Sequence, residues 1–267
     1  MTGDTPAKKS NGSMKTIDKA MKLLDFFLPN TPEWGLSDLA RSAGMDKVTT
    51  MRIMNSLAAN GLIEQHPETR KYRLGTAVLR LARIREASFP VVALLQPILE
   101  TLSEATGETA HASLAAGPAL TTIAIAEPHR STRVFVDPSQ PLPFHATASG
   151  LVFLAHASED LFQETVNQLD LPAFTSGTLR SADELRARVD QIRSDGYAVS
   201  ALTFEDDVVG VAAPIFDWHG EVFATIAAAC VSNRVTDETL SDVIAHVRTA
   251  ADRATRAMGG TPARKTR

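Results

Sequence analysis

The stretch LSDLARSAGMDKVTTMRIMNSLAAN, residues 36–60, decides the fold of the amino-terminal part of this chain. Ser37 can cap a short helix at its start. Ala40 and Gly44 stand four residues apart, as do the small residue and the turn glycine where two helices cross closely. A second helix follows, capped by Asp46 and ended by Gly61. The stretch therefore predicts a helix-turn-helix.

The two faces of this second helix differ in chemistry. Helical spacing gives the inner face residues that can pack in a core: Thr50, Ile53, Met54 and Leu57. The outer face carries the hydrogen-bond donors that suit the major groove of DNA: Lys47, Thr49, Arg52 and Asn55. We include Thr50 among the candidate DNA-binding residues as well.

A polar hairpin follows, with strand-like segments 62–65 and 72–75 on either side of a tip at 66–71. In a winged helix-turn-helix this tip lies against the phosphate backbone, where Arg70, Lys71 and Arg73 supply positive charge. Three-helix units can also serve protein contacts alone, but this combination favours DNA binding. The winged helix-turn-helix is expected to span 14–75, after a small, polar tail at 1–13 that we expect to be disordered.

Charge is distributed unevenly along the chain. The whole sequence of 267 residues has a net charge of −4, which by itself argues against nucleic acid as a partner. Residues 1–88, however, contain 14 Lys and Arg against 9 Asp and Glu, a net charge of +5, so the remainder has −9. This asymmetry indicates an anion-binding module joined to a different kind of domain.

The composition excludes several other classes of protein. With 44% hydrophobic and 22% charged residues the chain resembles an ordinary globular protein. No apolar run reaches the 18 residues of a membrane span, and the first ten residues lack the apolar run that we would expect of a signal peptide. The single cysteine, Cys230, cannot form an intramolecular disulfide. These features predict a cytoplasmic protein with no membrane partner.

The rest of the chain predicts a linker and a larger domain. Residues 76–89 have the pattern of an amphipathic linker helix, and Pro90 marks its end. Over 90–260 we expect helices at 94–107, 149–157, 159–169, 181–196 and 236–258, and strands at 111–115, 120–126, 133–136, 197–203, 208–216 and 221–231. Ser181 opens one helix with a capping box. Antiparallel strands with segregated helices give an α+β fold, followed by a second disordered tail at 261–267.

Short motifs recur in order along nearly the whole chain. They are GLIE at 61–64, YRLG at 72–75, TGETA at 106–110, LPFHATASG at 142–150, LPAFT at 171–175, RSDGYAV at 193–199 and GVAAPIFD at 210–217. In these motifs the chain resembles the IclR family of bacterial transcriptional regulators. The resemblance implies a GAF-like α/β effector-binding domain, a small-molecule effector, palindromic operator DNA and self-association as a dimer or tetramer.

The expected effector site centres on the start of the helix near 148. A helix amino-terminus offers free N–H groups and a positive dipole end to a carboxylate, and the family often binds organic acids. The small residues there can also simply allow close packing. The candidate effector-binding residues are His111, Thr147, Ala148, Ser149, Gly150, Ser200, Phe204, Gly210, Ala227 and Ala229.

Three departures from the family pattern bear on the effector. Leu151 stands where lysine is frequent, residues 200–204 delay the acidic run to 205–207, and alanines at 227–229 replace a Ser-x-Ser strand. Fewer polar partners would leave groups of a polar ligand unpaired, at a cost of about 1–3 kcal/mol each. We therefore expect a less polar effector, aromatic or hydrophobic, with one carboxylate near 148–150.

An enzyme is the competing class of protein. The seven histidines lack metal-ligand spacing, and the chain has no G-x-S-x-G elbow, P-loop or G-x-G-x-x-G motif. We expect Cys230, in an apolar strand, to be a buried thiol, and His145 to be a structural residue. We expect no catalytic residue, metal or cofactor. The alternatives to a DNA-binding regulator are a sensing module that acts through protein contacts and an enzyme of unrecognised chemistry.

Overall fold

The computed structural model describes residues 15–117, 119–168 and 171–261. Contacts divide the chain into an N-terminal unit, residues 1–89, and a C-terminal unit, residues 90–267. Each unit is described by itself. The predicted tail at 1–13 lies outside the described residues, as does the tail at 261–267 except for its first residue.

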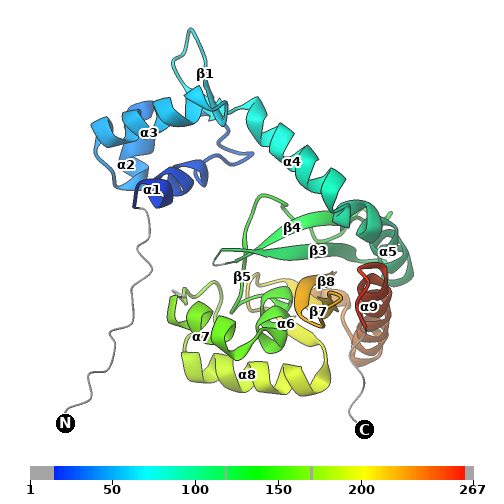
Figure 1. The fold of residues 1–267 in the computed structure, drawn as a ribbon. Coiled ribbons are helices and arrows are strands. Elements are labelled where there is room, and N and C mark those ends of the chain that lie inside the picture. The colour runs from blue at the N-terminus through cyan, green and yellow to red at the C-terminus, as the bar shows by residue number, and fades with distance from the viewer. Residues whose placement is uncertain (1–14, 118, 169–170, 262–267) are drawn as a thin grey trace, which may run out of the picture. The chain divides into compact units, whose positions relative to one another are not determined.

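The N-terminal unit contains three short helices, a hairpin and a fourth helix that follows the hairpin (Figure 1). Its elements are α1 (Lys15–Leu24), α2 (Leu36–Ala43), α3 (Lys47–Ala59), β1 (Ile63–Gln65), β2 (Tyr72–Leu74) and α4 (Thr76–Ser88). The hairpin is antiparallel, with Glu64 opposite Arg73. A compact apolar cluster, which includes Leu23, Leu39 and Met54, joins the first three helices. The unit is thus a winged helix-turn-helix followed by a helix.

Local signals in the sequence set the turn between α2 and α3. Gly44 adopts a left-handed conformation with φ of 66°, and the N–H of Met45 donates to the carbonyl of Ala40, which ends α2. The carboxylate of Asp46 accepts the N–H of Thr49 at 2.8 Å and starts α3, as predicted. Ser37, by contrast, is not a cap, because α2 begins one residue earlier, after Gly35.

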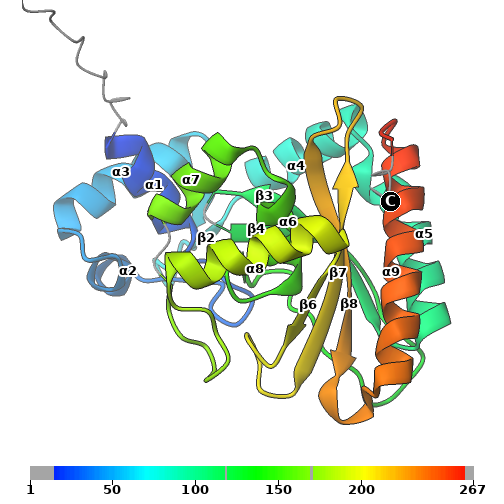
Figure 2. The same cartoon turned by 90° about the horizontal axis from the view of Figure 1, so that it is seen from below.

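The C-terminal unit is a six-stranded antiparallel sheet with helices on both faces. Its helices are α5 (Val91–Thr106), α6 (Ala148–His156), α7 (Glu159–Gln168), α8 (Ala182–Asp195) and α9 (Asp237–Ala257). Its strands are β3 (Thr109–Ala116), β4 (Ala119–Ala126), β5 (Leu142–Pro143), β6 (Ala198–Ala201), β7 (Val208–Phe216) and β8 (Val222–Val231). The order across the sheet is β5-β4-β3-β8-β7-β6. Figure 2 shows α5 and α9 on one face and α6 to α8 on the other.

Alternation along the strands builds a separate apolar core on each face of this sheet. On β8, Ala224, Ile226 and Ala228 pack in the core that α5 and α9 cover, whereas Ala227 packs in the core beneath α6 and α8. The hydroxyl of Ser181 caps α8 in the predicted capping box. Asp217 closes the predicted turn between β7 and β8 by accepting the N–H of His219 at 2.8 Å.

The predicted strand at 133–136 does not form, and this stretch belongs to an irregular segment between β4 and β5. It cannot pair with β3, which already pairs with β4 on one side and β8 on the other. Side chains hold the segment instead. The hydroxyl of Thr109 donates to the carbonyl of Val134 at 2.7 Å, and Arg234 donates to the carbonyl of Thr132 at 3.0 Å.

Candidate functional sites

The outer face of α3 carries the predicted donor set. Lys47, Arg52 and Asn55 are exposed, and Thr49 is half-buried. Thr50 differs, because it is fully buried and its hydroxyl donates to the carbonyl of Asp46 at 3.0 Å. We therefore remove Thr50 from the candidate DNA-binding residues and assign it to the core beneath the helix.

Two apolar residues share this outer face and were not identified from the sequence. Val48 is 61% exposed and Met51 is 40% exposed. Apolar side chains in a major groove contact the methyl group of thymine. Val48 stands four residues before Arg52, and Met51 four residues after Lys47. This spacing was the available signal, since a helix places residues four apart on one face.

The hairpin presents its cations at the tip and along β2. Arg70 and Lys71 are exposed, and Arg70 has a φ of 57°, a left-handed conformation that is unusual for a residue with a side chain. The side-chain amide of Gln65 donates to the carbonyl of Arg70 at 2.8 Å and holds the tip. Arg73 is also exposed and pairs with Glu64 across the strands at 3.3 Å.

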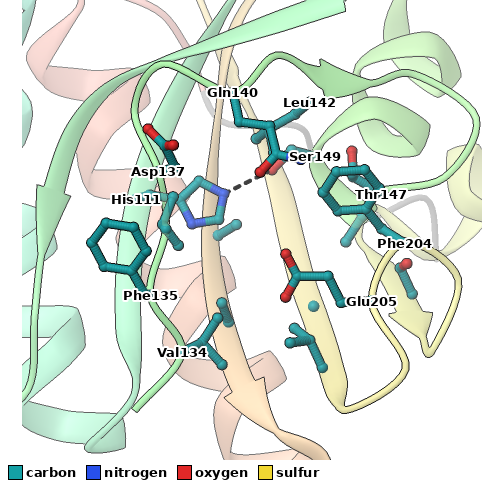
Figure 3. A pocket seen from close by; sticks show the side chains of 17 residues that line it. His111, Val134, Phe135, Asp137, Gln140, Leu142, Thr147, Ser149, Phe204 and Glu205 are labelled. Atoms are coloured by element: carbon teal, nitrogen blue, oxygen red, sulfur yellow. Dashed lines mark hydrogen bonds between the residues drawn. The ribbon is translucent and has the colours of Figure 1, made fainter. Parts of the chain in front are cut away.

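A cavity of about 80 Å³ lies in the C-terminal unit, on the face of the sheet that α6 covers. Side chains from several elements surround it (Figure 3). Nine of the ten effector-binding candidates line this cavity: His111, Thr147, Ala148, Ser149, Ser200, Phe204, Gly210, Ala227 and Ala229. Residues up to 118 positions apart in the sequence therefore meet at one site.

Gly150 does not line the cavity and has a packing role instead. A Cβ atom at this position would lie 2.5 Å from the Cα of Phe144 and 2.5 Å from the carbonyl oxygen of Pro143. Only glycine allows α6 to approach the 143–144 backbone so closely. The packing interpretation of the small residues therefore holds at this position.

Eight lining residues were not identified from the sequence, and most belong to the irregular segment before β5. They are Val134, Phe135, Val136, Asp137, Gln140, Leu142, Glu205 and Val208. The sequence placed 133–136 in a strand. A strand paired within the sheet gave no reason to expect these residues at the cavity. The acidic run at 205–207 was visible in the sequence, but its approach to the cavity was not.

The amino-terminus of α6 forms one wall of the cavity. The hydroxyl of Thr147 accepts the N–H of Gly150 at 3.0 Å, and Leu151 donates the first internal backbone hydrogen bond of the helix. The N–H groups of Ala148 and Ser149 precede that bond, so the helix itself does not use them. Gly210 lies opposite Ala148, and a Cβ atom added to Gly210 would lie 3.3 Å from the Cβ of Ala148.

His111 contributes a neutral polar group beside this wall. Burial lowers the pKa of His111 to about 4, so the ring is uncharged near neutral pH. Its Nε2 lies 3.5 Å from the Ser149 hydroxyl, the contact drawn as a dashed line in Figure 3. Its buried Nδ1 has no hydrogen-bond partner within the described part of the chain.

Two carboxylates line the cavity, and no lining residue is a lysine or an arginine. Asp137 accepts hydrogen bonds from the hydroxyl and the N–H of Ser139, which lower its pKa. Glu205 keeps contact with solvent, yet partial burial and then the neighbouring charge of Asp207 raise its pKa. The cavity thus joins an anion-attracting helix end to an acidic wall.

The other reactive side chains have structural surroundings. Burial first, and then the charge of Glu108, raise the pKa of Cys230 to about 12, so its thiol stays protonated. His145 is buried and its Nε2 lies 3.0 Å from the carbonyl oxygen of Pro172. Across the described ranges no three His, Cys, Asp or Glu residues are grouped to hold a metal ion. No helix in these ranges has the length and apolarity to cross a membrane.

Known proteins resemble both units. The family described as "Bacterial transcriptional regulator IclR C-terminal" matches residues 87–256, and the "IclR helix-turn-helix domain" matches residues 16–67. The regulator BhcR of Paracoccus denitrificans is 30% identical over 87% of this chain and 83% of its own length. The regulator XynR of Escherichia coli is 27% identical over 92% and 98%.

Solved structures agree with these matches. An IclR-type regulator from Silicibacter sp. TM1040 has 36% sequence identity and a TM-score of 0.85, over 94% of this chain and 98% of that one. An IclR homologue from Microbacterium hydrocarbonoxydans, complexed with 4-hydroxybenzoate, has a TM-score of 0.73 over 91% of this chain and 99% of that one. At 22% sequence identity it shares the fold. The relatives are regulators and repressors of transcription, in a family that is not enzymatic. The chain belongs to the IclR family and is a transcriptional regulator with a DNA-binding helix-turn-helix and a C-terminal ligand-binding domain.

Proposed function

We propose that this regulator binds palindromic operator DNA through α3 and the β1–β2 hairpin, and that a small organic acid of low polarity controls it from the cavity beside α6. The observation that carries the proposal is the opening of the α6 amino-terminus into a cavity with apolar walls. Backbone N–H groups at a helix start bind a carboxylate, and the walls accept the remainder of the ligand.

The exposed side chains of the N-terminal unit support two kinds of DNA contact, with base edges through α3 and with phosphates through the hairpin. Lys47, Thr49, Arg52 and Asn55 occupy the part of α3 that enters a major groove in this kind of fold, and Val48 and Met51 complete its surface with apolar contacts. Arg70, Lys71 and Arg73 of the hairpin supply charge for the phosphates, which positions the protein without reading sequence.

Substitution of Arg52 tests the DNA-binding face. We expect Arg52→Ala to weaken operator binding by about 1–3 kcal/mol and to relax the preference at one base pair. Gel-shift titrations with DNA from upstream of the protein's own gene, and with single-base variants of it, measure both effects. Arg253→Ala, which removes the same charge from the exposed face of α9, is the matched control. Equal affinities for Arg52→Ala and the unmodified protein would contradict the assignment.

Exposed apolar residues on α4 support self-association as a dimer or tetramer. Leu79 is 62% exposed, Ile84 is 53% exposed and no residue of this helix is buried within the chain. Such a surface favours contact with a second copy. A symmetric dimer then matches half-sites about 10 bp apart. Light scattering after gel filtration measures the mass, and a monomer at the concentrations that bind operator would contradict this part of the proposal.

Calorimetric titration tests the effector. We expect benzoate-type monocarboxylates to bind more tightly than short hydroxy or keto acids, because Phe204 and the alanines at 227 and 229 contribute apolar walls and no hydroxyl groups. The complex of the Microbacterium homologue with 4-hydroxybenzoate supports an aromatic acid as the first probe. A clear preference for glyoxylate or pyruvate would refute the low-polarity effector.

A further inference from the structure

We infer that Glu205 binds a hydrogen-bond donor of the ligand, so that the effector carries one carboxylate and, at a distance from it, a hydroxyl or ammonium group. This inference rests on the proposed function, because it requires the ligand carboxylate to occupy the amino-terminus of α6. It adds a second contact that determines specificity, between Glu205 and a hydrogen-bond donor of the ligand.

The cavity offers two chemically different kinds of contact. The N–H groups of Ala148 and Ser149 at the start of α6 attract an anion. Glu205 enters from the loop between β6 and β7, and Figure 3 shows its carboxylate directed toward the middle of the cavity, on the side toward His111. A ligand that fills the space therefore meets hydrogen-bond donors at the start of α6 and an acceptor at Glu205.

The groups around Glu205 leave its carboxylate able to accept a hydrogen bond from a ligand. Asp137, the other acid of the cavity, is already engaged by Ser139 through two hydrogen bonds. Glu205 has no hydrogen bond or ion pair with the other described residues, and the charge that acts on its pKa is the like charge of Asp207. A donor on the ligand would gain a charge-assisted hydrogen bond, whereas a second carboxylate would add repulsion.

The surroundings of Glu205 make the contact selective. Phe204 precedes Glu205 in the chain, and Val208 and Val134 line the same cavity from the start of β7 and from the irregular segment before β5. A site built to bond a ligand hydroxyl discriminates strongly against an analogue that lacks it.

The test compares benzoates that differ at ring position 4, on the full-length protein, by titration calorimetry. We expect 4-hydroxybenzoate to bind about tenfold more tightly than 4-methylbenzoate, since one good hydrogen bond to a charged acceptor is worth about one order of magnitude in affinity. We expect 4-(aminomethyl)benzoate also to exceed 4-methylbenzoate, and terephthalate, with its second carboxylate, to bind most weakly. The same substituents at ring position 3 test a shorter separation of the two groups.

Two variants of Glu205 separate charge from hydrogen bonding. Glu205→Gln retains a neutral acceptor, so it should lose the preference for the ammonium ligand and keep part of the preference for the hydroxyl. Glu205→Leu should lose both. Asp206→Asn is the matched control, because it removes a negative charge from the adjacent exposed residue, which does not line the cavity, and should leave both ratios unchanged.

Each outcome decides between the inference and the proposal beneath it. Equal binding of the hydroxyl and methyl ligands to the unmodified protein overturns the role of Glu205 but leaves the low-polarity effector intact. A hydroxyl preference that persists in Glu205→Leu has the same consequence. If no benzoate-type monocarboxylate binds, while short polar acids do, the proposed effector class and the inference both fail.

Discussion

At the scale of single residues, the buried imidazole of His111 makes stability depend on pH. Burial holds the folded-state pKa of His111 at about 4, against an ordinary value of 6.5. Below pH 6.5 the unfolded chain takes up a proton that the folded chain does not accept until about pH 4. The stability contributed by the neutral ring is therefore complete above pH 6.5 and is lost as the pH falls toward 4.

The prediction concerns the variant His111→Gln. Its free energy of unfolding should vary less between pH 7 and pH 4.5 than that of the unmodified protein, by up to about 3 kcal/mol, because the shifted proton uptake is absent. Urea unfolding of the C-terminal unit within the full-length chain, followed at several pH values, gives the measurement. His219→Gln, at an exposed position of the β7–β8 turn, serves as the control and should retain the slope of the unmodified protein. An unchanged slope for His111→Gln would refute the argument.

At the scale of elements, the position of α6 depends on Gly150. Replacing glycine with alanine inside a helix ordinarily stabilises it by about 0.5–1 kcal/mol. At this position the new Cβ would meet the backbone of 143–144 at 2.5 Å, so the helix must move. We predict that Gly150→Ala destabilises the protein by about 1–3 kcal/mol, the usual range for overpacking, and weakens effector binding as well.

Thermal unfolding with and without benzoate measures both effects of Gly150→Ala. Ser194→Ala in α8 provides a comparison, because it raises helix propensity at an exposed position. Its melting temperature should be unchanged or slightly higher. If Gly150→Ala behaves in the same way, the close approach of α6 to 143–144 does not constrain the helix.

At the scale of the whole molecule, the two ligands of the regulator meet opposite electrostatics. Operator DNA meets an N-terminal part with a net charge of +5, whereas the effector enters a C-terminal part with −9. The cavity would offer the carboxylate of the proposed effector neutral N–H groups and no lysine or arginine. Salt should therefore weaken binding of DNA far more than binding of the effector.

The expected difference is large enough for direct titration. A dimer whose hairpins supply three cations each would make about six phosphate contacts, so raising salt from about 50 to about 200 mM should lower operator affinity by about 10³-fold. Affinity for a benzoate should change by less than about threefold over the same range. Equal salt dependence of the two affinities would contradict the assignment of charge to function.

The sequence was sufficient where a feature depends on neighbours a few residues apart. The left-handed Gly44 and the Asp46 cap form the helix-turn-helix through contacts within one or two turns, and the Ser181 capping box works in the same way. Helix and strand periods also placed most elements of the C-terminal unit. Ser37 shows the limit of local signals, because the helix starts one residue before it.

Only the tertiary structure decided which residues surround the cavity. The strand expected at 133–136 does not form: β3, whose Thr109 bonds to Val134, already pairs with β4 and β8, and the segment lines the cavity instead. Gly150 proved to be a packing residue. The acidic run at 205–207 was evident in the sequence, but only the structure showed that Glu205 lines the cavity. The sequence by itself determined the winged helix-turn-helix, the family and the split of charge, since these depend on local order along the chain. The shape and polarity of the cavity depend on contacts between residues distant in sequence, which only the pairing of strands and the seating of α6 bring together.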